Sequence, residues 1–287
     1  MNAVKIIECP RDAMQGISEW IPTDVKVNYL NHLLRVGFDT IDFGSFVSPK
    51  AIPQMRDTAE VLSRLDLTGA RSKLLAIVAN ERGAHDASAF DEIHYLGYPF
   101  SISETFQKRN TNAGIEESVS RVGELAEICA RSKKELVVYV SMGFGNPYGD
   151  PWSPELAATW SERLYREFDV RILALSDTVG AATPDSIASL FNVLIPQLPG
   201  VEFGAHLHST PATCIDKLDA ALQAGCRRFD GAMKGWGGCP MATDTLTGNM
   251  PTELMVEHFV HRGIEVGIDS EAFSDAVQVA DTIFLDH

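Results

Sequence analysis

Two histidines lie two positions apart in the stretch VEFGAHLHST, at His206 and His208. The apolar residues before them predict a β-strand, in which residues i and i+2 project from the same face, about 6 to 7 Å apart along the backbone. Both imidazoles can therefore face one metal ion. The same spacing also suits two histidines that only fill space on one face of a strand, so the rest of the chain has to decide.

Other polar residues fall where predicted strands end. They are Arg11, Asp12, Asp42, Asp177, Thr178 and, just beyond the last strand, Asn249. One carboxylate and two imidazoles can supply three protein ligands to a divalent cation and leave positions open for substrate oxygens, and Asn249 can add a neutral carbonyl oxygen. The pattern therefore favours a metal site with room for a substrate.

Each of these residues also has a purely structural interpretation. Arg11 and Asp12 can form a local ion pair, and Asp177 can cap the turn before the next helix. Asp42 can be a buried carboxylate that accepts hydrogen bonds from backbone amides. The functional interpretation depends on all of them lying at one end of one fold.

A glycine-rich stretch, KGWGGCP, follows the last predicted strand. Its glycines surround Trp236 and leave a backbone that is free to move or to approach a ligand closely, and Cys239 lies on it. A thiol on such a segment suits an acid or a base better than a metal ligand. The alternative is a tight turn with a packed, inert cysteine.

Eight apolar, β-branched runs alternate with segments of helical period along the chain. These runs are VKIIEC (4–9), TIDFG (40–44), KLLAIVA (73–79), EIHYLGY (92–98), ELVVYVSM (135–142), RILALSD (171–177), VEFGAHLH (201–208) and RRFDGAM (227–233). Thr183 and Ser153, each before a proline, predict two of the helix starts. The rhythm predicts an α/β fold, a (β/α)8 TIM barrel with extra C-terminal helices, as one catalytic domain over 1–287, in preference to a doubly wound open sheet. The active site of such a barrel lies at the C-terminal ends of its strands.

The overall composition excludes several classes of partner. A formal net charge of −15 argues against nucleic acid and against an anionic membrane surface. The apolar runs are shorter than a membrane-spanning helix, and the N-terminus has no signal-peptide pattern, so we expect a cytoplasmic protein. Five cysteines without CxxC spacing indicate reduced thiols.

Several motifs together resemble those of the 3-hydroxy-3-methylglutaryl-CoA lyases, members of the metal-dependent lyase barrels. The resemblance extends over nearly the whole chain. Its motifs are PRDAMQ (10–15), SFVSPKAIPQM (45–55), SETFQKRNTNAGIEES (103–118), DTVGAATP (177–184), HLH (206–208) and GWGGCPMATDTLTGN (235–249).

The resemblance implies a metal-dependent carbon–carbon lyase that cleaves 3-hydroxy-3-methylglutaryl-CoA, or a close 3-hydroxyacyl-CoA, to acetyl-CoA and acetoacetate, as in leucine degradation. It implies a homo-oligomer, a dimer in many members, and Mg²⁺ or Mn²⁺ as the cation, although the donor types also suit Zn²⁺.

The implied metal ligands are Asp12, His206, His208 and Asn249. The implied catalytic residues are Arg11 beside the thioester carbonyl, Asp42 and Asp177 near the reacting hydroxyl, and Cys239 on a closing loop. Weaker candidates for contacts with substrate or CoA are Gln15, Lys50, Lys108, Arg109 and Thr178, although basic loop residues are usually only solvated.

The chain departs from the family pattern at two positions near the expected site. Asp42 replaces the usual glutamate and is shorter by one methylene, and Ser209 replaces the aspartate that usually follows the second histidine. We expect the first change to alter reach and the second to remove a charge from near the metal. Both favour the alternative of a related aldolase or Claisen-type enzyme acting on another hydroxy acid. A second alternative is a barrel that binds metal or acyl-CoA without turnover, but Arg11, Asp177 and Cys239 weigh against it, because a binding protein needs neither an enolate stabiliser nor a mobile thiol.

Overall fold

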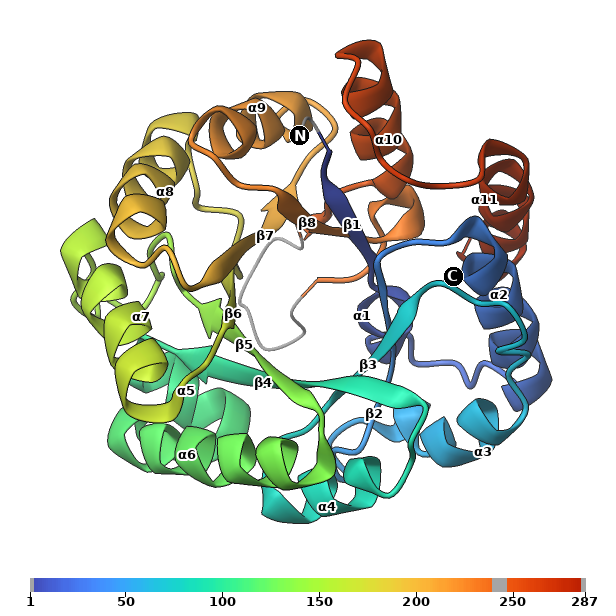
Figure 1. Ribbon diagram of the computed structural model, residues 1–287, viewed down its shortest axis with the longest axis horizontal. Helices are drawn as coiled ribbons and strands as arrows, with labels where there is room; N and C mark the ends of the chain where they lie inside the picture. Colours follow the sequence, from blue (N-terminus) through green and yellow to red (C-terminus); the bar gives the residue numbers. More distant parts are fainter. Residues whose placement is uncertain (1–2, 239–246, 285–287) are drawn as a thin grey trace.

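The computed structural model describes residues 3–238 and 247–284, and its strands close into a barrel surrounded by helices (Figure 1). The strands of the barrel are β1 Lys5–Glu8, β2 Thr40–Ser45, β3 Lys73–Ile77, β4 Ile93–Ser101, β5 Glu135–Ser141, β6 Ile172–Asp177, β7 Glu202–Ser209 and β8 Arg228–Gly231. Each pairs in parallel with its neighbour in sequence, and β8 pairs with β1 to close the ring. The predicted (β/α)8 barrel is confirmed.

The helices cover the outside of the barrel. They are α1 Pro10–Gln15, α2 Thr23–Val36, α3 Thr58–Ser63, α4 Glu81–Ser88, α5 Glu104–Thr111, α6 Ile115–Ser132, α7 Pro154–Phe168, α8 Pro184–Gln197, α9 Cys214–Gln223, α10 Thr252–His261 and α11 Ser270–Phe284, with short 3-10 turns η1 Pro53–Met55 and η2 Met233–Gly235. The predicted helix starts are confirmed, because Thr183 forms a capping box with Ser186 and Ser153 accepts a hydrogen bond from the backbone N–H of Leu156.

The alternation of side chains along each strand separates two apolar clusters. One cluster fills the interior of the barrel and comprises Leu75, Ile77, Tyr95, Val137, Tyr139, Ile172 and Ala174. The larger cluster lies between the barrel and its helices and includes the intervening residues of the same strands, such as Leu173 and Leu175 of β6. The strand position of a polar residue therefore decides whether its side chain faces the interior or the helices.

The chain after β8 supplies the predicted extra C-terminal helices. The short strand β9 Gly248–Asn249 pairs antiparallel with the end of β7, with Asn249 opposite His208. Helix α11 packs on α2, where the rings of Tyr29 and Phe284 meet edge to face at 5.9 Å between centroids (Figure 1). In the described part of the chain, no helix has the length and apolar character needed to cross a membrane.

Candidate functional site

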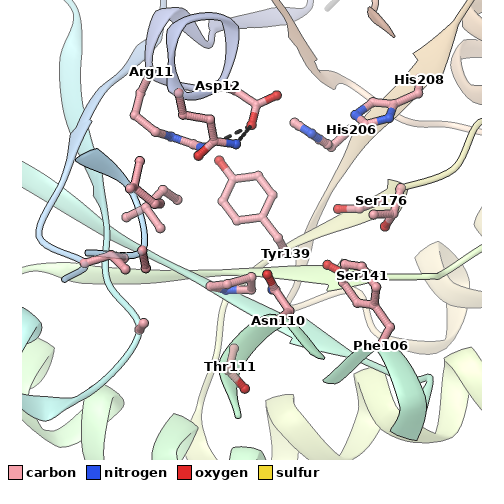
Figure 2. A pocket seen from close by; sticks show the side chains of 18 residues that line it. Arg11, Asp12, Phe106, Asn110, Thr111, Tyr139, Ser141, Ser176, His206 and His208 are labelled. Carbon is pink, nitrogen blue, oxygen red and sulfur yellow. Dashed lines mark hydrogen bonds and ion pairs between the residues drawn. The ribbon is translucent and has the colours of Figure 1, made fainter. Parts of the chain in front are cut away.

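A pocket opens at the C-terminal ends of the barrel strands, with a cavity of about 240 Å³. Its polar lining is Arg11, Asp12, Gln15, Asn110, Thr111, Tyr139, Ser141, Ser176, Thr178, His206 and His208, and its apolar lining is Val47, Ala51, Ile52, Ile77, Ala79, Pro99 and Phe106. Figure 2 shows Arg11 and Asp12 at one side of the pocket with His206 and His208 beside them. The pocket lies at the end of the barrel where the fold predicts an active site.

Asp12, His206 and His208 form a cluster that can hold a metal ion. A ligand atom from each lies within 4.8 Å of the others, and all three residues are buried. The two histidines come from alternate positions of β7, and Asp12 comes from the helical turn α1 that follows β1. A carboxylate with two imidazoles suits Mn²⁺ or Zn²⁺ as well as Mg²⁺, so this donor set fits a divalent cation without identifying it.

The electrostatics favour the protonation states that a cation needs at Asp12 and His208, whereas at His206 the contact with Asp230 outweighs burial and raises the pKa. Burial and the neighbouring His206 lower the pKa of His208 to about 4, so its imidazole is neutral near pH 7. Burial works to raise the pKa of Asp12, but the charges of Arg11 and His206 outweigh it and the net shift is downward. Asp12 is therefore an anion and His208 a neutral donor.

Asn249 reaches the same cluster through the pairing of β9 with β7. Its amide nitrogen donates to Asp12 Oδ2 at 2.7 Å and to the carbonyl oxygen of Trp236 at 2.9 Å. The structure therefore brings Asn249 to the candidate metal site. Its role as a ligand stays a prediction, because the contact it makes here is from the amide nitrogen.

Arg11 is held by three side chains of the site. Its Nε donates to both oxygens of Asp42 at 3.2 and 3.0 Å, and one terminal nitrogen donates to Asp12 at 3.0 Å and to Gln15 at 2.9 Å. Burial raises the pKa of Asp42 to about 6 in spite of the Arg11 charge. Asp42 does not line the pocket, whereas Arg11 does, so the short aspartate side chain acts on the pocket through the guanidinium.

Asp177 lies away from the pocket, contrary to what its place at a strand end suggested. One carboxylate oxygen accepts from Lys217 Nζ at 2.7 Å and the other accepts from the backbone N–H of Ala182 at 3.0 Å. Its neighbour Ser176 lines the pocket instead, because consecutive residues of β6 face opposite sides of the barrel wall. These contacts agree with the alternative interpretation, in which Asp177 caps the turn before the next helix.

Ser209 is likewise separated from the expected metal site. It follows His208 on β7, so its side chain is on the opposite face of the strand. There it lies near Cys214, whose thiol pKa burial raises to about 11, a rise that the Ser209 hydroxyl partly offsets. The loss of an aspartate at this position therefore alters the helix-facing side of β7.

The weaker candidates divide between the pocket and its surroundings. Gln15 and Thr178 line the pocket, where the Thr178 hydroxyl accepts from the backbone N–H of Met142 at 3.0 Å. Lys50, Lys108 and Arg109 are exposed and are not among the lining residues. Their contacts with CoA stay predictions.

Cys239 lies outside the described residues. The described cysteines, Cys9, Cys129, Cys214 and Cys226, are free and buried. Their state agrees with the expectation of reduced thiols in that part of the chain.

Three polar residues of β5 and β6 that line the pocket were missed in the sequence: Tyr139, Ser141 and Ser176. The Tyr139 ring points toward Arg11 and Asp12 in Figure 2, and its hydroxyl has no hydrogen-bond partner among the described residues. Burial raises the pKa of Tyr139, so the hydroxyl stays protonated and can donate to a bound oxygen. The signal that could have found these residues is the alternation of inward and outward positions along β5 and β6.

Comparison with known proteins places the whole chain in one family. The HMGL-like family model matches residues 3–280. The cytoplasmic 3-hydroxy-3-methylglutaryl-CoA lyase of Rattus norvegicus is 33% identical over 95% of this chain and 79% of its own length, and the hydroxymethylglutaryl-CoA lyase YngG of Bacillus subtilis is 32% identical over 94% and 89%.

Solved structures give the same result. The HMG-CoA lyase of Brucella melitensis superposes with a TM-score of 0.91 at 29% identity and covers 99% of both chains. An HMG-CoA lyase of Acinetobacter baumannii, solved with coenzyme A and 3-methylmalate, superposes with a TM-score of 0.90 at 29% identity over 98% of this chain and 91% of its own. The chain therefore belongs to the HMGL-like family and is an enzyme that resembles the hydroxymethylglutaryl-CoA lyases.

Proposed function

We propose that the protein is a divalent-metal-dependent lyase that cleaves 3-hydroxy-3-methylglutaryl-CoA to acetyl-CoA and acetoacetate. The observation that carries this proposal is the placement of Arg11 beside the Asp12–His206–His208 cluster in one pocket. A retro-Claisen cleavage needs a cation to bind the hydroxyl and carboxylate oxygens and a positive group where the thioester enolate develops. Both needs are met by residues that line this pocket.

Asp12, His206 and His208 would hold the cation, with Asn249 as a further candidate ligand. The cation supplies Lewis acidity, which lowers the pKa of the substrate hydroxyl. Mg²⁺ and Mn²⁺ are the proposed metals because the donors include carboxylate and amide oxygens beside the imidazoles, and Zn²⁺ fits the same set.

Arg11 has the central catalytic role in the proposed reaction. When the C–C bond breaks, its electron pair moves to the α-carbon of the thioester and the negative charge spreads to the thioester oxygen. The Arg11 guanidinium lines the pocket and stabilises that charge, while Asp42 keeps the guanidinium in place.

Two protons move in the proposed reaction. The hydroxyl proton goes to Asp12, a carboxylate that lines the pocket, whereas Asp42 does not line the pocket and acts through Arg11. The Cys239 thiol then gives a proton to the α-carbon of the enolate, which completes acetyl-CoA and leaves acetoacetate as the ketone product. We do not assign a proton to Asp177, because Lys217 and Ala182 occupy its carboxylate.

The size of the cavity agrees with a short acyl group as the part of the substrate that enters. At about 240 Å³ it is smaller than the roughly 300–1,000 Å³ of pockets that enclose drug-sized ligands. The nucleotide end of CoA would lie outside, where Lys50, Lys108 and Arg109 are the candidate phosphate contacts. The single catalytic domain, the homodimer and the cytoplasmic location stay predictions.

The test is to incubate the metal-free and the Mg²⁺- or Mn²⁺-loaded protein with a panel of 3-hydroxyacyl-CoA esters and to measure acetyl-CoA release. Release from the methylglutaryl ester, only with metal, is the expected result. Release from another ester alone would favour a related Claisen-type enzyme, an alternative that the shortened Asp42 supports. Binding of the esters without release would identify a non-catalytic barrel.

Loss of a ligand tests the metal site itself. We expect His206→Ala to lose most of the bound metal, because the cluster would keep only one imidazole. Metal content by mass spectrometry of the purified variant is the measurement. A variant purified with full metal stoichiometry would refute the ligand assignment.

A further inference from the structure

A second set of polar side chains lies inside the barrel around His206. Arg228 and Asp230 occupy alternate positions of β8 and are 0% and 2% exposed. Charged groups are rare in such interiors unless they are paired or functional. Neither residue lines the pocket, so the proposed reaction leaves both unexplained.

Asp230 makes one contact that bears on the candidate metal site. Its Oδ2 lies 3.2 Å from His206 Nδ1, a hydrogen bond in which the protonated ring nitrogen donates to the carboxylate. That contact occupies Nδ1 and leaves Nε2 as the nitrogen that can face a cation. A carboxylate that accepts the second N–H of a metal-binding histidine fixes both the tautomer and the orientation of the ring.

Arg228 lies two positions before Asp230 on β8 but makes no hydrogen bond to it. Its three guanidinium nitrogens and Oδ1 of Asp230 are buried and have no hydrogen-bond partner among the described residues. The ion pairs of Arg228 are with Asp39 at 3.8 Å and Glu202 at 3.9 Å. Burial works to lower the pKa of Arg228, but the charge of Asp230 and other neighbours outweighs it and keeps the guanidinium charged.

The space for this arginine is created by a glycine on the adjacent strand. A Cβ at Gly204 of β7 would lie only 3.1 Å from Arg228 Cδ, in the same row as His206 and His208. Gly204 thus allows the Arg228 side chain to lie inside the barrel beside β7.

We propose that Asp230 is a positioning residue for His206. His206 then presents Nε2 to the divalent cation in a single orientation. This inference rests on the proposed metal site, which it extends by one residue that does not itself bind the metal.

Cys9 gives the competing arrangement. Its thiol, His206 and Asp230 also have ligand atoms within 4.8 Å of one another, so a cation could bind deeper in the barrel with Asp230 as a direct ligand. A thiolate ligand suits Zn²⁺ or Co²⁺ better than Mg²⁺. The experiment must therefore separate an orienting carboxylate from a ligating one.

The experiment compares wild type with Asp230→Asn and Cys9→Ser at one fixed pH. Binding of Mn²⁺ to the metal-free protein is measured by isothermal titration calorimetry, and Co²⁺ binding is followed by the visible spectrum. Asp57→Asn is the matched control, because Asp57 is a partly buried carboxylate paired with Lys26 in an ion pair that does not include the cluster. Circular dichroism and thermal melts establish which variants are folded.

We expect Asp230→Asn to bind Mn²⁺ roughly 10- to 100-fold more weakly and to shift the Co²⁺ bands. Cys9→Ser and Asp57→Asn should stay within twofold of wild type. These results would support an orienting role of Asp230.

Two outcomes would overturn the proposal. Unchanged Mn²⁺ affinity and an unchanged Co²⁺ spectrum in folded Asp230→Asn would remove its positioning role. A strong thiolate-to-cobalt charge-transfer band that disappears in Cys9→Ser would identify the deeper site instead. His206→Ala and His208→Ala separate a failure of this inference from a failure of the proposed metal site. If both variants lose their metal, the site stands and only the role of Asp230 fails, whereas a His208→Ala variant that keeps its metal overturns the site.

Discussion

Two buried ion pairs lie near the ends of the barrel strands, one on each side of the barrel wall. Arg11 and Asp42 face the pocket side, with side chains 8% and 1% exposed, and the arginine lines the pocket. Lys217 and Asp177 are buried as deeply, at 5% and 1%, but they lie on the side of the helices, where the lysine also donates to the carbonyl oxygen of His208 at 2.7 Å. Two ion pairs of similar type and similar burial thus lie on opposite sides of the barrel wall, and only one of them reaches the pocket.

A position at the end of a barrel strand therefore does not by itself identify a functional residue. Asp177 and Ser176 are neighbours in sequence, yet only Ser176 lines the pocket. The Asp177–Lys217 pair supports the backbone of β7 beneath the candidate metal ligands, whereas the Arg11–Asp42 pair presents a charge to the substrate. Variants of the two pairs should therefore fail in different ways.

The largest expected change in free energy comes from Asp177→Asn. The substitution leaves the Lys217 ammonium buried with only carbonyl partners, and we expect the free energy of unfolding to fall by about 3–5 kcal/mol. Urea denaturation measures this change. The kcat of the folded, metal-saturated variant should fall by less than about tenfold. A stable variant with a far lower kcat would show instead that Asp177 reaches the substrate.

Arg11→Met is expected to have the largest effect on catalysis. The loss of a group that stabilises the developing charge should lower kcat by roughly 10²- to 10³-fold. Steady-state kinetics give the rate, and metal analysis should show that the cation is retained. Arg11→Lys is the companion variant and should recover little, because an ammonium cannot contact Asp42, Asp12 and Gln15 together. A kcat near that of wild type in Arg11→Met would end the assignment.

The pH dependence of kcat/KM further distinguishes Asp42 from Asp177. Burial raises the pKa of Asp42 from 3.8 to about 6, and the ionised form holds Arg11. As the pH falls through this value Asp42 becomes protonated, so we expect kcat/KM to fall by about tenfold per unit below pH 6. Asp42→Asn should lower the rate and remove this acid limb. An acid limb that persists unchanged in Asp42→Asn would assign it to another group.

The smallest effect is expected at Ser176, the pocket-facing neighbour of Asp177. Its hydroxyl lines the cavity, and its loss in Ser176→Ala should raise KM roughly 2- to 10-fold, as for one hydrogen bond, with little change in kcat. Ser161→Ala is the control, since Ser161 is a buried serine of α7 whose hydroxyl donates to the Ala157 carbonyl far along the chain from the pocket. Equal KM values for both variants would show that Ser176 does not contact substrate.

Much of the fold could be predicted from the sequence because the signals are local. The eight apolar runs are the eight barrel strands, within a few residues at each end. The helix starts at Thr183 and Ser153 were predictable because a hydroxyl before a proline caps a helix through contacts within four residues. The spacing of His206 and His208 likewise predicted that both rings share one face of β7.

The candidate site was predicted in part. Arg11, Asp12, His206 and His208 were predicted and lie together in the pocket, while Tyr139 and Ser141 were missed because tyrosine and serine in an apolar run carry no chemical signal by themselves. Asp177 was expected there because it ends β6. The prediction did not consider that successive side chains of a strand face opposite sides of the sheet. The contact of Asp230 with His206 had no sequence signal, since it joins two neighbouring strands, β8 and β7.

The sequence by itself determined the elements, the barrel and the types of residue available for chemistry, because periodicity and capping act over a few residues. Only the tertiary structure decided which of those residues meet. Asp12 and Asn249 are 237 positions apart and make a hydrogen bond of 2.7 Å because the closed barrel brings β1 beside β8 and carries β9 back onto β7. The tertiary structure also decided which carboxylates lie on the pocket side of the barrel, because the register of the whole sheet sets the side of the barrel wall that each side chain faces.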